Sequence, residues 1–61
     1  MMKLYEVPFT LQIYVSGVVR YVRTSVHIAA TSEDEAREKI RSQMRIELSQ
    51  IHKPIEIDYK S

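Results

Sequence analysis

Three groups of residues in this sequence have side chains suited to proton chemistry, anion binding or partner recognition. The first is Glu6 with His27, which lie opposite each other if the segment between them folds as a β-hairpin. A carboxylate beside an imidazole can transfer a proton, but catalysis also needs a nucleophile and a concave site, and the pattern predicts neither. We therefore expect a cross-strand pair on the surface and a protein that is not an enzyme.

The second group is the arginine series Arg37, Arg41 and Arg45, whose spacing of four places all three on one flank of a helix. Such a stripe could contact phosphates or an acidic partner. The alternative is a solvated helix face, because acidic residues in the same segment partly neutralise it. The sequence leaves both interpretations open.

The third group combines aromatic and basic side chains on one face of the predicted hairpin, where Tyr14 lies opposite Val19, and Tyr21 and Arg23 follow on the same face. Tyr and Arg are enriched at the energetic centres of protein interfaces, and the same side chains can stack on nucleic-acid bases. The alternative is an exposed strand filled with residues of high β propensity. We predict that Tyr14, Val19, Tyr21 and Arg23 bind a partner.

Motifs for cofactors and metals are missing from the chain. One glycine is too few for a phosphate-binding loop, and the absence of cysteine removes every Cys-x-x-Cys site. His27 and His52 are distant in the sequence, so we expect no metal centre and no cofactor. The 9 Lys and Arg nearly balance the 8 Asp and Glu, whereas nucleic-acid binders usually carry a basic excess. A protein partner is therefore favoured over nucleic acid.

These candidates depend on a long hairpin over residues 3–28. The odd positions of its first strand are apolar and most even positions are polar, which is the period of two typical of a strand. Ser16-Gly17 supplies the turn, because glycine tolerates the positive φ of a tight hairpin. Val15 then faces Val18 and Leu11 faces Val22, and a slip of one residue would separate the apolar faces. The apolar odd positions are Tyr5, Val7, Phe9, Leu11, Ile13 and Val15.

A helix should follow, from about Glu33 to about Ile51. Ser32 and Glu35 match the Ser-x-x-Glu capping box, in which each side chain bonds the backbone N–H of the other residue. Pro54 disfavours helical backbone in the residue before it, so the helix ends before that point. The apolar stripe of this helix, at steps of four, four, four and three, is Ala36, Ile40, Met44, Leu48 and Ile51.

After Pro54 the alternation returns and predicts a short third strand. Ile55, Ile57 and Tyr59 share one face, and Glu56, Asp58 and Lys60 share the other. The order β-β-α-β gives a single α+β domain over residues 1–61, with strand order second-first-third and one helix on one face of the sheet. The other face is left open. We expect a core of Val7, Leu11, Val22, Val26, Ile40, Met44, Leu48 and Ile57.

A chain of 61 residues buries a thin core, and domains of this size usually gain stability from disulfides, a metal or a partner subunit. Without cysteine, and with only two distant histidines as metal ligands, a homodimer or a constitutive partner subunit is the remaining expectation. No apolar run reaches the length of a signal peptide or a membrane span, so we expect a soluble, cytoplasmic protein. His52 should lie as a cation beside the C-terminal end of the helix dipole.

The passage from Val26 through Ser32 to Ala36 resembles the strand-to-helix entry of very small phage proteins. The T7-type phage inhibitor of bacterial RNA polymerase and some small anti-CRISPR proteins share the β-β-α-β layout. The chain differs from that inhibitor in its last strand, where it exposes acidic residues in place of arginines. The resemblance implies a phage or mobile-element protein that binds and inhibits a larger host machine. The alternative is a small nucleic-acid-binding protein.

Overall fold

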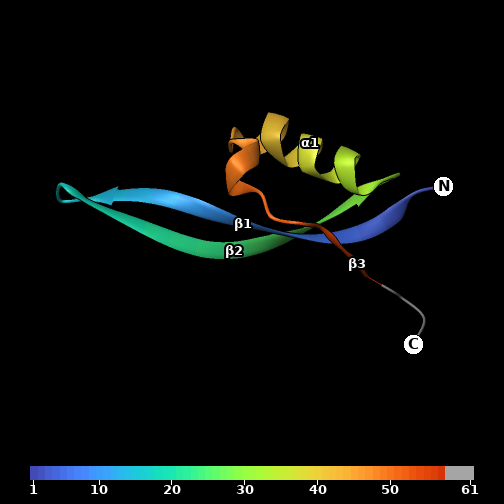
Figure 1. Ribbon diagram of the computed structural model, residues 1–61, viewed down its shortest axis with the longest axis horizontal. Coiled ribbons are helices and arrows are strands. Elements are labelled where there is room, and N and C mark those ends of the chain that lie inside the picture. The colour runs from blue at the N-terminus through green and yellow to red at the C-terminus, as the bar shows by residue number, and fades with distance from the viewer. Residues whose placement is uncertain (58–61) are drawn as a thin grey trace.

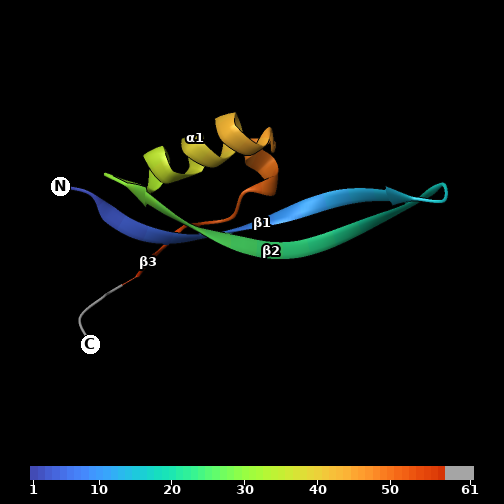
Figure 2. The same ribbon diagram turned by 180° about the vertical axis from the view of Figure 1, so that it is seen from behind.

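The computed structural model describes residues 1–57, which form a three-stranded antiparallel sheet with one α-helix on one face (Figures 1 and 2). The elements are β1 (Lys3–Val15), β2 (Val18–Ala30), α1 (Glu33–Met44), the 3₁₀ turn η1 (Leu48–Gln50) and β3 (Ile55–Ile57). The strand order is β2-β1-β3, with both outer strands antiparallel to β1. The predicted α+β class and strand order are confirmed.

The hairpin has the predicted register, with Val15 opposite Val18, Leu11 opposite Val22 and one residue facing one residue along its whole length. Ser16 and Gly17 have φ values of 50° and 78°. Positive φ at both central residues is the signature of the type I′ turn, whose twist matches that of the two strands. Local turn chemistry and the apolar alternation therefore agree on a single pairing.

Pro8 lies in the middle of β1 without breaking the ladder to β2. In an antiparallel sheet, the N–H and C=O of one residue point to the same neighbouring strand, and the side alternates along the chain. The His52 N–H donates to the Pro8 carbonyl over 2.8 Å, so position 8 points away from β2. The missing N–H of proline therefore removes no bond between β1 and β2.

His52 itself lies at the sheet edge and not at the end of a helix, so the predicted role beside the helix dipole is wrong. Its ring is half-buried, and Nε2 lies 2.9 Å from the Thr10 hydroxyl.

The helix begins where the sequence predicts, with Ser32 as N-cap. The Glu35 N–H donates to Ser32 Oγ over 3.1 Å. The return contact differs from the predicted capping box, because the Glu35 carboxylate accepts from the N–H and the hydroxyl of Thr31, at 3.0 and 2.9 Å. These bonds hold the pKa of Glu35 below its ordinary value, and the positive charge of Lys39 adds a smaller effect in the same direction.

The helix ends at Met44, and the prediction that it continues to Ile51 is wrong. Arg45 adopts the left-handed conformation, with φ 55° and ψ 40°, and turns the chain back toward the sheet. Met44 and Leu48 stay exposed at 42% and 41%, while Ile46 and Ile51 are buried in their place. The apolar stripe of the prediction was therefore continued past the point where the backbone leaves the helix.

Residues 45–51, which lead from the helix back to the sheet, are called the returning segment. The half-buried side chain of Arg37 holds this segment in place. Its guanidinium donates to the carbonyls of Leu48 and Ile51 over 3.1 and 3.3 Å. Ile51 in turn forms an antiparallel bridge with Phe9 of β1. The segment after α1 is thus fixed to the helix on one side and to the sheet on the other.

The core lies under α1. There the half of the hairpin away from its turn packs against the helix and the returning segment. Of the predicted core, Val7 and Ile40 are buried, and Leu11 and Val26 pack at its margin. Val22 is exposed, as are Met44 and Leu48, so these three predictions are wrong. The buried core is Tyr5, Val7, Phe9, Ala30, Ala36, Ile40, Ile46 and Ile51.

The short strand β3 turns its isoleucines to the open face of the sheet. Leu4 pairs with Ile57 and Glu6 with Ile55, and residues directly opposite each other share a face. Position 4 is on the face away from α1, so Ile57 is half-buried there and does not join the core under the helix as predicted. The predicted members Asp58, Tyr59 and Lys60 of this strand lie outside the described residues.

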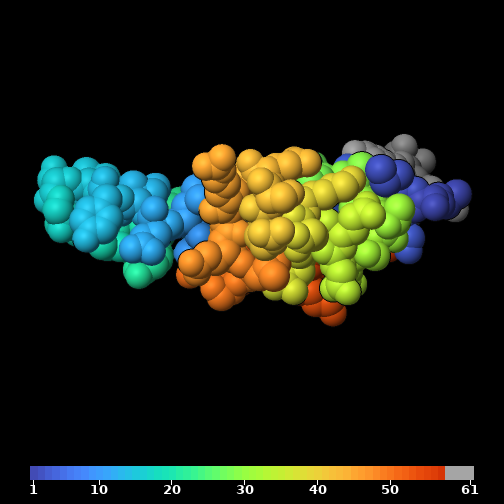
Figure 3. Space-filling view, turned by 90° about the horizontal axis from the view of Figure 1, so that it is seen from above, coloured from blue at the N-terminus to red at the C-terminus, as the bar shows by residue number. Residues whose placement is uncertain are grey.

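The distal half of the hairpin extends beyond the helix and beyond β3. We call residues 10–23 the hairpin arm. The molecule measures 44 × 24 × 15 Å, and its long axis follows the hairpin (Figure 1). The space-filling view from the helix side shows the arm without any covering element (Figure 3). The fold therefore consists of a small packed body and a bare two-stranded projection.

Candidate protein-interaction surface

The face of the arm turned away from α1 carries the predicted partner-binding residues. Tyr14 lies opposite Val19, Gln12 opposite Tyr21 and Thr10 opposite Arg23, as the sequence predicted. The two tyrosines are 71% and 66% exposed. Arg23 is exposed and Val19 is half-buried beside them. The register thus assembles an aromatic and basic patch from both strands on one face.

The opposite face of the arm, on the helix side, is equally bare and more apolar. Its aliphatic side chains, 38–59% exposed, are Ile13, Val15, Val18 and Val22. The apolar alternation predicts these residues on the face under the helix, whereas the structure leaves them uncovered. The lengths of the helix and the strands explain why this face is bare. A helix of 12 residues spans about 18 Å, whereas a strand of 13 residues spans about 43 Å, so the helix covers less than half of the hairpin.

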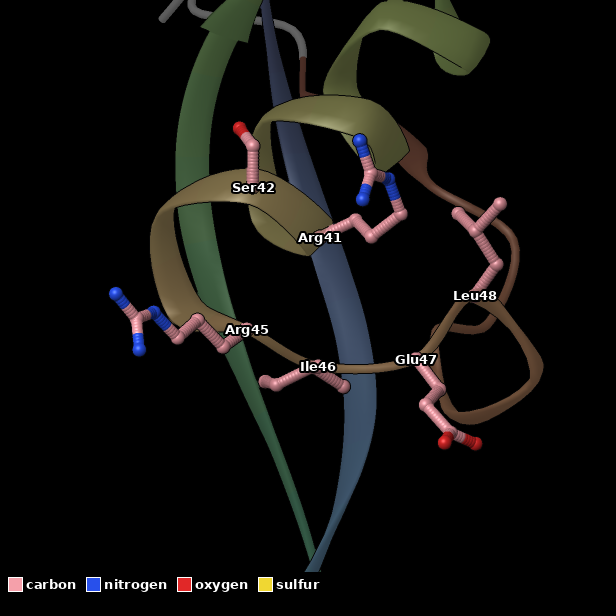
Figure 4. Close-up of a pocket in the computed structure, with 6 residues that line it drawn as sticks. All are labelled: Arg41, Ser42, Arg45, Ile46, Glu47 and Leu48. Atoms are coloured by element: carbon pink, nitrogen blue, oxygen red, sulfur yellow. The ribbon is translucent and has the colours of Figure 1, made fainter.

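The arm meets the body at a shallow depression between β1 and the end of α1. Thr10, Leu11 and Gln12 line one side, and Met44 and Ile46 line the other. A second depression lies on the returning segment, where Ile46 and Leu48 supply apolar surface (Figure 4). The depression beside the arm is also lined by Arg45, Glu47 and Gln50, so polar groups separate the apolar face of the arm from the apolar surface at Ile46 and Leu48.

The arginine series does not form one free basic stripe. Arg37 is engaged with the carbonyls of the returning segment, and Arg41 pairs with Glu38 one turn earlier. This pairing lowers the pKa of Glu38 and raises that of Arg41. Arg45 has left the helix, and its side chain points in a different direction from that of Arg41 (Figure 4). The structure therefore places the three arginines in three different settings.

Glu6 and His27 form the cross-strand pair that the register predicted, with 3.7 Å between Glu6 Oε1 and His27 Nε2. Both side chains lie on the open sheet face, where His27 is exposed and Glu6 is half-buried. In this geometry the pair is a surface ion pair when the imidazole is protonated.

Charge is distributed unevenly between the arm and the body. No Asp or Glu occurs between Val7 and Ser32, whereas Arg20 and Arg23 lie in that stretch. All eight acidic residues belong to the remaining parts of the chain. The arm is therefore apolar and basic, and the body carries the negative charge.

Within residues 1–57, no cluster of three or more His, Cys, Asp or Glu side chains could hold a metal ion. In the same part of the chain, no helix has the length and hydropathy to cross a membrane. Comparisons with protein-family models, with curated proteins and with solved structures find no match for this chain.

Proposed function

We propose that this protein is a non-enzymatic interaction module that binds a larger protein through the hairpin arm and modulates its activity. The observation that carries the proposal is the bare projection itself. Six large apolar or aromatic side chains are exposed on its two faces, and an exposed apolar patch of this kind typically marks an interaction site. Tyr14, Val19, Tyr21 and Arg23 supply the contact on the open face.

The size of the patch indicates what the partner must provide. Full burial of a Val or Ile side chain is worth about 1.5–3 kcal/mol, so four half-exposed ones contribute about 3–6 kcal/mol. Association itself costs about 4–15 kcal/mol. Aliphatic burial alone is therefore insufficient for a stable complex, and the tyrosines and Arg23 must also be engaged. The partner surface should combine an apolar groove with acidic groups, to match an arm that lacks acidic residues.

The layout supports an inhibitor or adaptor role. Small phage proteins with the same element order act on larger host proteins or nucleoprotein machines, and a narrow two-stranded arm suits insertion into a cleft of such a machine. We propose the same class of role here.

The second candidate function is nucleic-acid binding. A two-stranded ribbon fits the major groove, and the arm carries Arg20 and Arg23 with no acidic residue. Two free arginines neutralise few phosphates, and two of the three helix arginines are engaged within the protein. A protein partner therefore ranks first.

The test is partner capture with matched variants. We expect the tagged wild type to retain a specific protein from an extract of its source cells, and Tyr14→Ser/Tyr21→Ser to lose it. Gln43→Ser, on the exposed helix surface, is the control and should retain it. In parallel, binding to single- and double-stranded DNA and RNA is measured between about 50 and 200 mM salt. Micromolar, steeply salt-dependent binding that Arg20→Ala/Arg23→Ala abolishes would reverse the ranking of the two functions.

A further inference from the structure

The outer edge of β2 offers unpaired backbone groups along most of its length. β2 is the first strand in the order β2-β1-β3, so β1 pairs with one side of it only. Lys39 Nζ donates to the Ala29 carbonyl over 2.7 Å, which shows that position 29 points outward. By the alternation of an antiparallel ladder, the outward positions are therefore Val19, Tyr21, Arg23, Ser25 and His27. Lys39 closes this edge at Ala29 and leaves it open from Val19 to His27.

This edge lacks two of the features that usually prevent strands from pairing between molecules, a proline and a β-bulge. β2 has 13 residues, contains no proline, and keeps a one-to-one register with β1 without a bulge. Arg20 and Arg23 are the charged residues on it. A long and regular edge is a template for another strand.

We propose that β2 pairs antiparallel with β2 of a second copy of this chain, with Thr24 on the two-fold axis. Position 24 is the midpoint of Val18–Ala30, so this register aligns the two strands end to end. The backbone pairs form between Tyr21 and His27 of each copy, and Ala29 stays bonded to Lys39. It places Val22 opposite Val26 of the second copy and Arg23 opposite Ser25 of the second copy. A register centred on Arg23 would instead place two guanidinium groups directly opposite each other, which is unfavourable.

The antiparallel arrangement also matches the charges and apolar surfaces of the two copies. Residues 18–22 of one arm lie opposite residues 30–26 of the other copy, which is the half of β2 that α1 covers. Arg20 therefore approaches the end of the strand that leads into the acidic first turn, Glu33 to Glu35, of the second copy. The bare helix-side face of each arm lies beside the helix of its neighbour. One contact thus accounts for the projecting arm, its apolar inner face and the separation of charge.

This dimer uses the strand edge, and it leaves the open face with Tyr14 and Tyr21 free for another protein. The proposal does not depend on the proposed function, because the oligomeric state of the purified protein is measured without any partner. If no partner were captured, the proposed function would fail but the dimer proposal would be unaffected. If the purified protein were monomeric, the dimer proposal would fail but the arm would still be available to a partner.

The experiment uses the fact that only the residue on the axis faces its own counterpart. In sedimentation equilibrium we expect the wild type at twice its 7.2 kDa chain mass. Thr24→Lys and Thr24→Glu should each weaken the dimer at least about tenfold, since like charges then face each other across the axis. Mixing the two variants should restore it. Gln43→Lys is the control with a change of charge away from the edge, and circular dichroism verifies that each variant is folded.

A second variant reports the register directly. Because the chain has no cysteine, Thr24→Cys introduces a single thiol. Directly opposite residues in a non-hydrogen-bonded antiparallel pair have Cα atoms about 4.5 Å apart, within the range for a disulfide. We expect rapid formation of a disulfide-linked dimer with Thr24→Cys and not with Gln43→Cys. A wild type that remains monomeric at 100 micromolar concentration, or a dimer that neither Thr24→Lys nor Thr24→Glu weakens, would overturn the proposal.

Discussion

Replacement of Arg37 by methionine tests whether this side chain holds the returning segment or serves as a free cation. Met keeps the apolar stem of the side chain and removes the two bonds to the carbonyls of Leu48 and Ile51. The Leu48 carbonyl still accepts the Ile51 N–H, whereas the Ile51 carbonyl loses the guanidinium. Hydrogen bonds from charged donors contribute about 1.5–3 kcal/mol each, and the partial exposure of this pair lowers the sum to about 2–3 kcal/mol.

Such a loss is large for a chain of this length, whose total stability should be about 3–9 kcal/mol. Urea unfolding followed by circular dichroism should show the lower midpoint, and the Tm should fall by roughly 10–20 °C. Arg41→Met removes an exposed pair with Glu38, which solvent screens, so its midpoint should stay close to that of the wild type. Equal, small effects of Arg37→Met and Arg41→Met would refute the anchoring role.

Three further substitutions or pairs test other parts of the fold. Ile46→Ala should destabilise the protein by about 2–5 kcal/mol in the same urea assay, because Ile46 is buried. Leu48→Ala should cost less than about 1 kcal/mol, because Leu48 is exposed. A larger effect at Leu48 than at Ile46 would instead support a helix that continues to Ile51. Above the ordinary pKa of 4.5, the lowered pKa of Glu35 contributes stability that is lost as the pH falls through its folded-state value. Glu35→Gln should therefore lower the Tm at pH 7 and make no difference at pH 2; a constant difference would contradict this. Ser16→Asn should raise the Tm slightly, since Asn-Gly is the preferred type I′ turn; a fall would argue against the positive φ at that position.

The hairpin could be predicted from the sequence because two independent signals fix its register. The alternation of apolar residues sets which side chains share a face, and Ser16-Gly17 sets where the chain reverses. The start of the helix was predictable for a similar reason, since Ser32 and the acidic first turn are local features. Each of these signals acts within a few residues of the backbone that it determines.

The end of the helix could not be predicted in this way. The chain leaves the helix at Arg45, which is neither the Gly nor the Asn that usually takes a left-handed position. The apolar pattern meanwhile continues through Leu48, so periodicity extends the helix past its true end. What decides the outcome is tertiary packing: Ile46 and Ile51 reach the core, and Phe9 and Arg37 hold the segment that carries them.

The third strand shows a different limit. Alternation in Ile55-Glu56-Ile57 establishes two faces, but only the pairing with Leu4 and Glu6 determines which one lies under the helix. The candidate site was likewise half predictable. The register gave the tyrosine face, whereas the bare helix-side face follows from the length of α1, which the apolar pattern overestimated.

Deletion of the distal arm tests the central claim that the arm serves interaction and the body serves the fold. Leu11 and Val22 form the same type of cross-strand pair, with both backbone hydrogen bonds, as Val15 and Val18, which flank the natural turn. A Ser-Gly turn can therefore join Leu11 directly to Val22 in place of residues 12–21. None of the buried core residues is removed. The measurement is partner capture by this shortened protein, with thermal unfolding as the check on its fold. We predict a folded protein with a Tm close to that of the wild type and no retained partner. A shortened protein that unfolds, or that still captures the partner, would contradict the account.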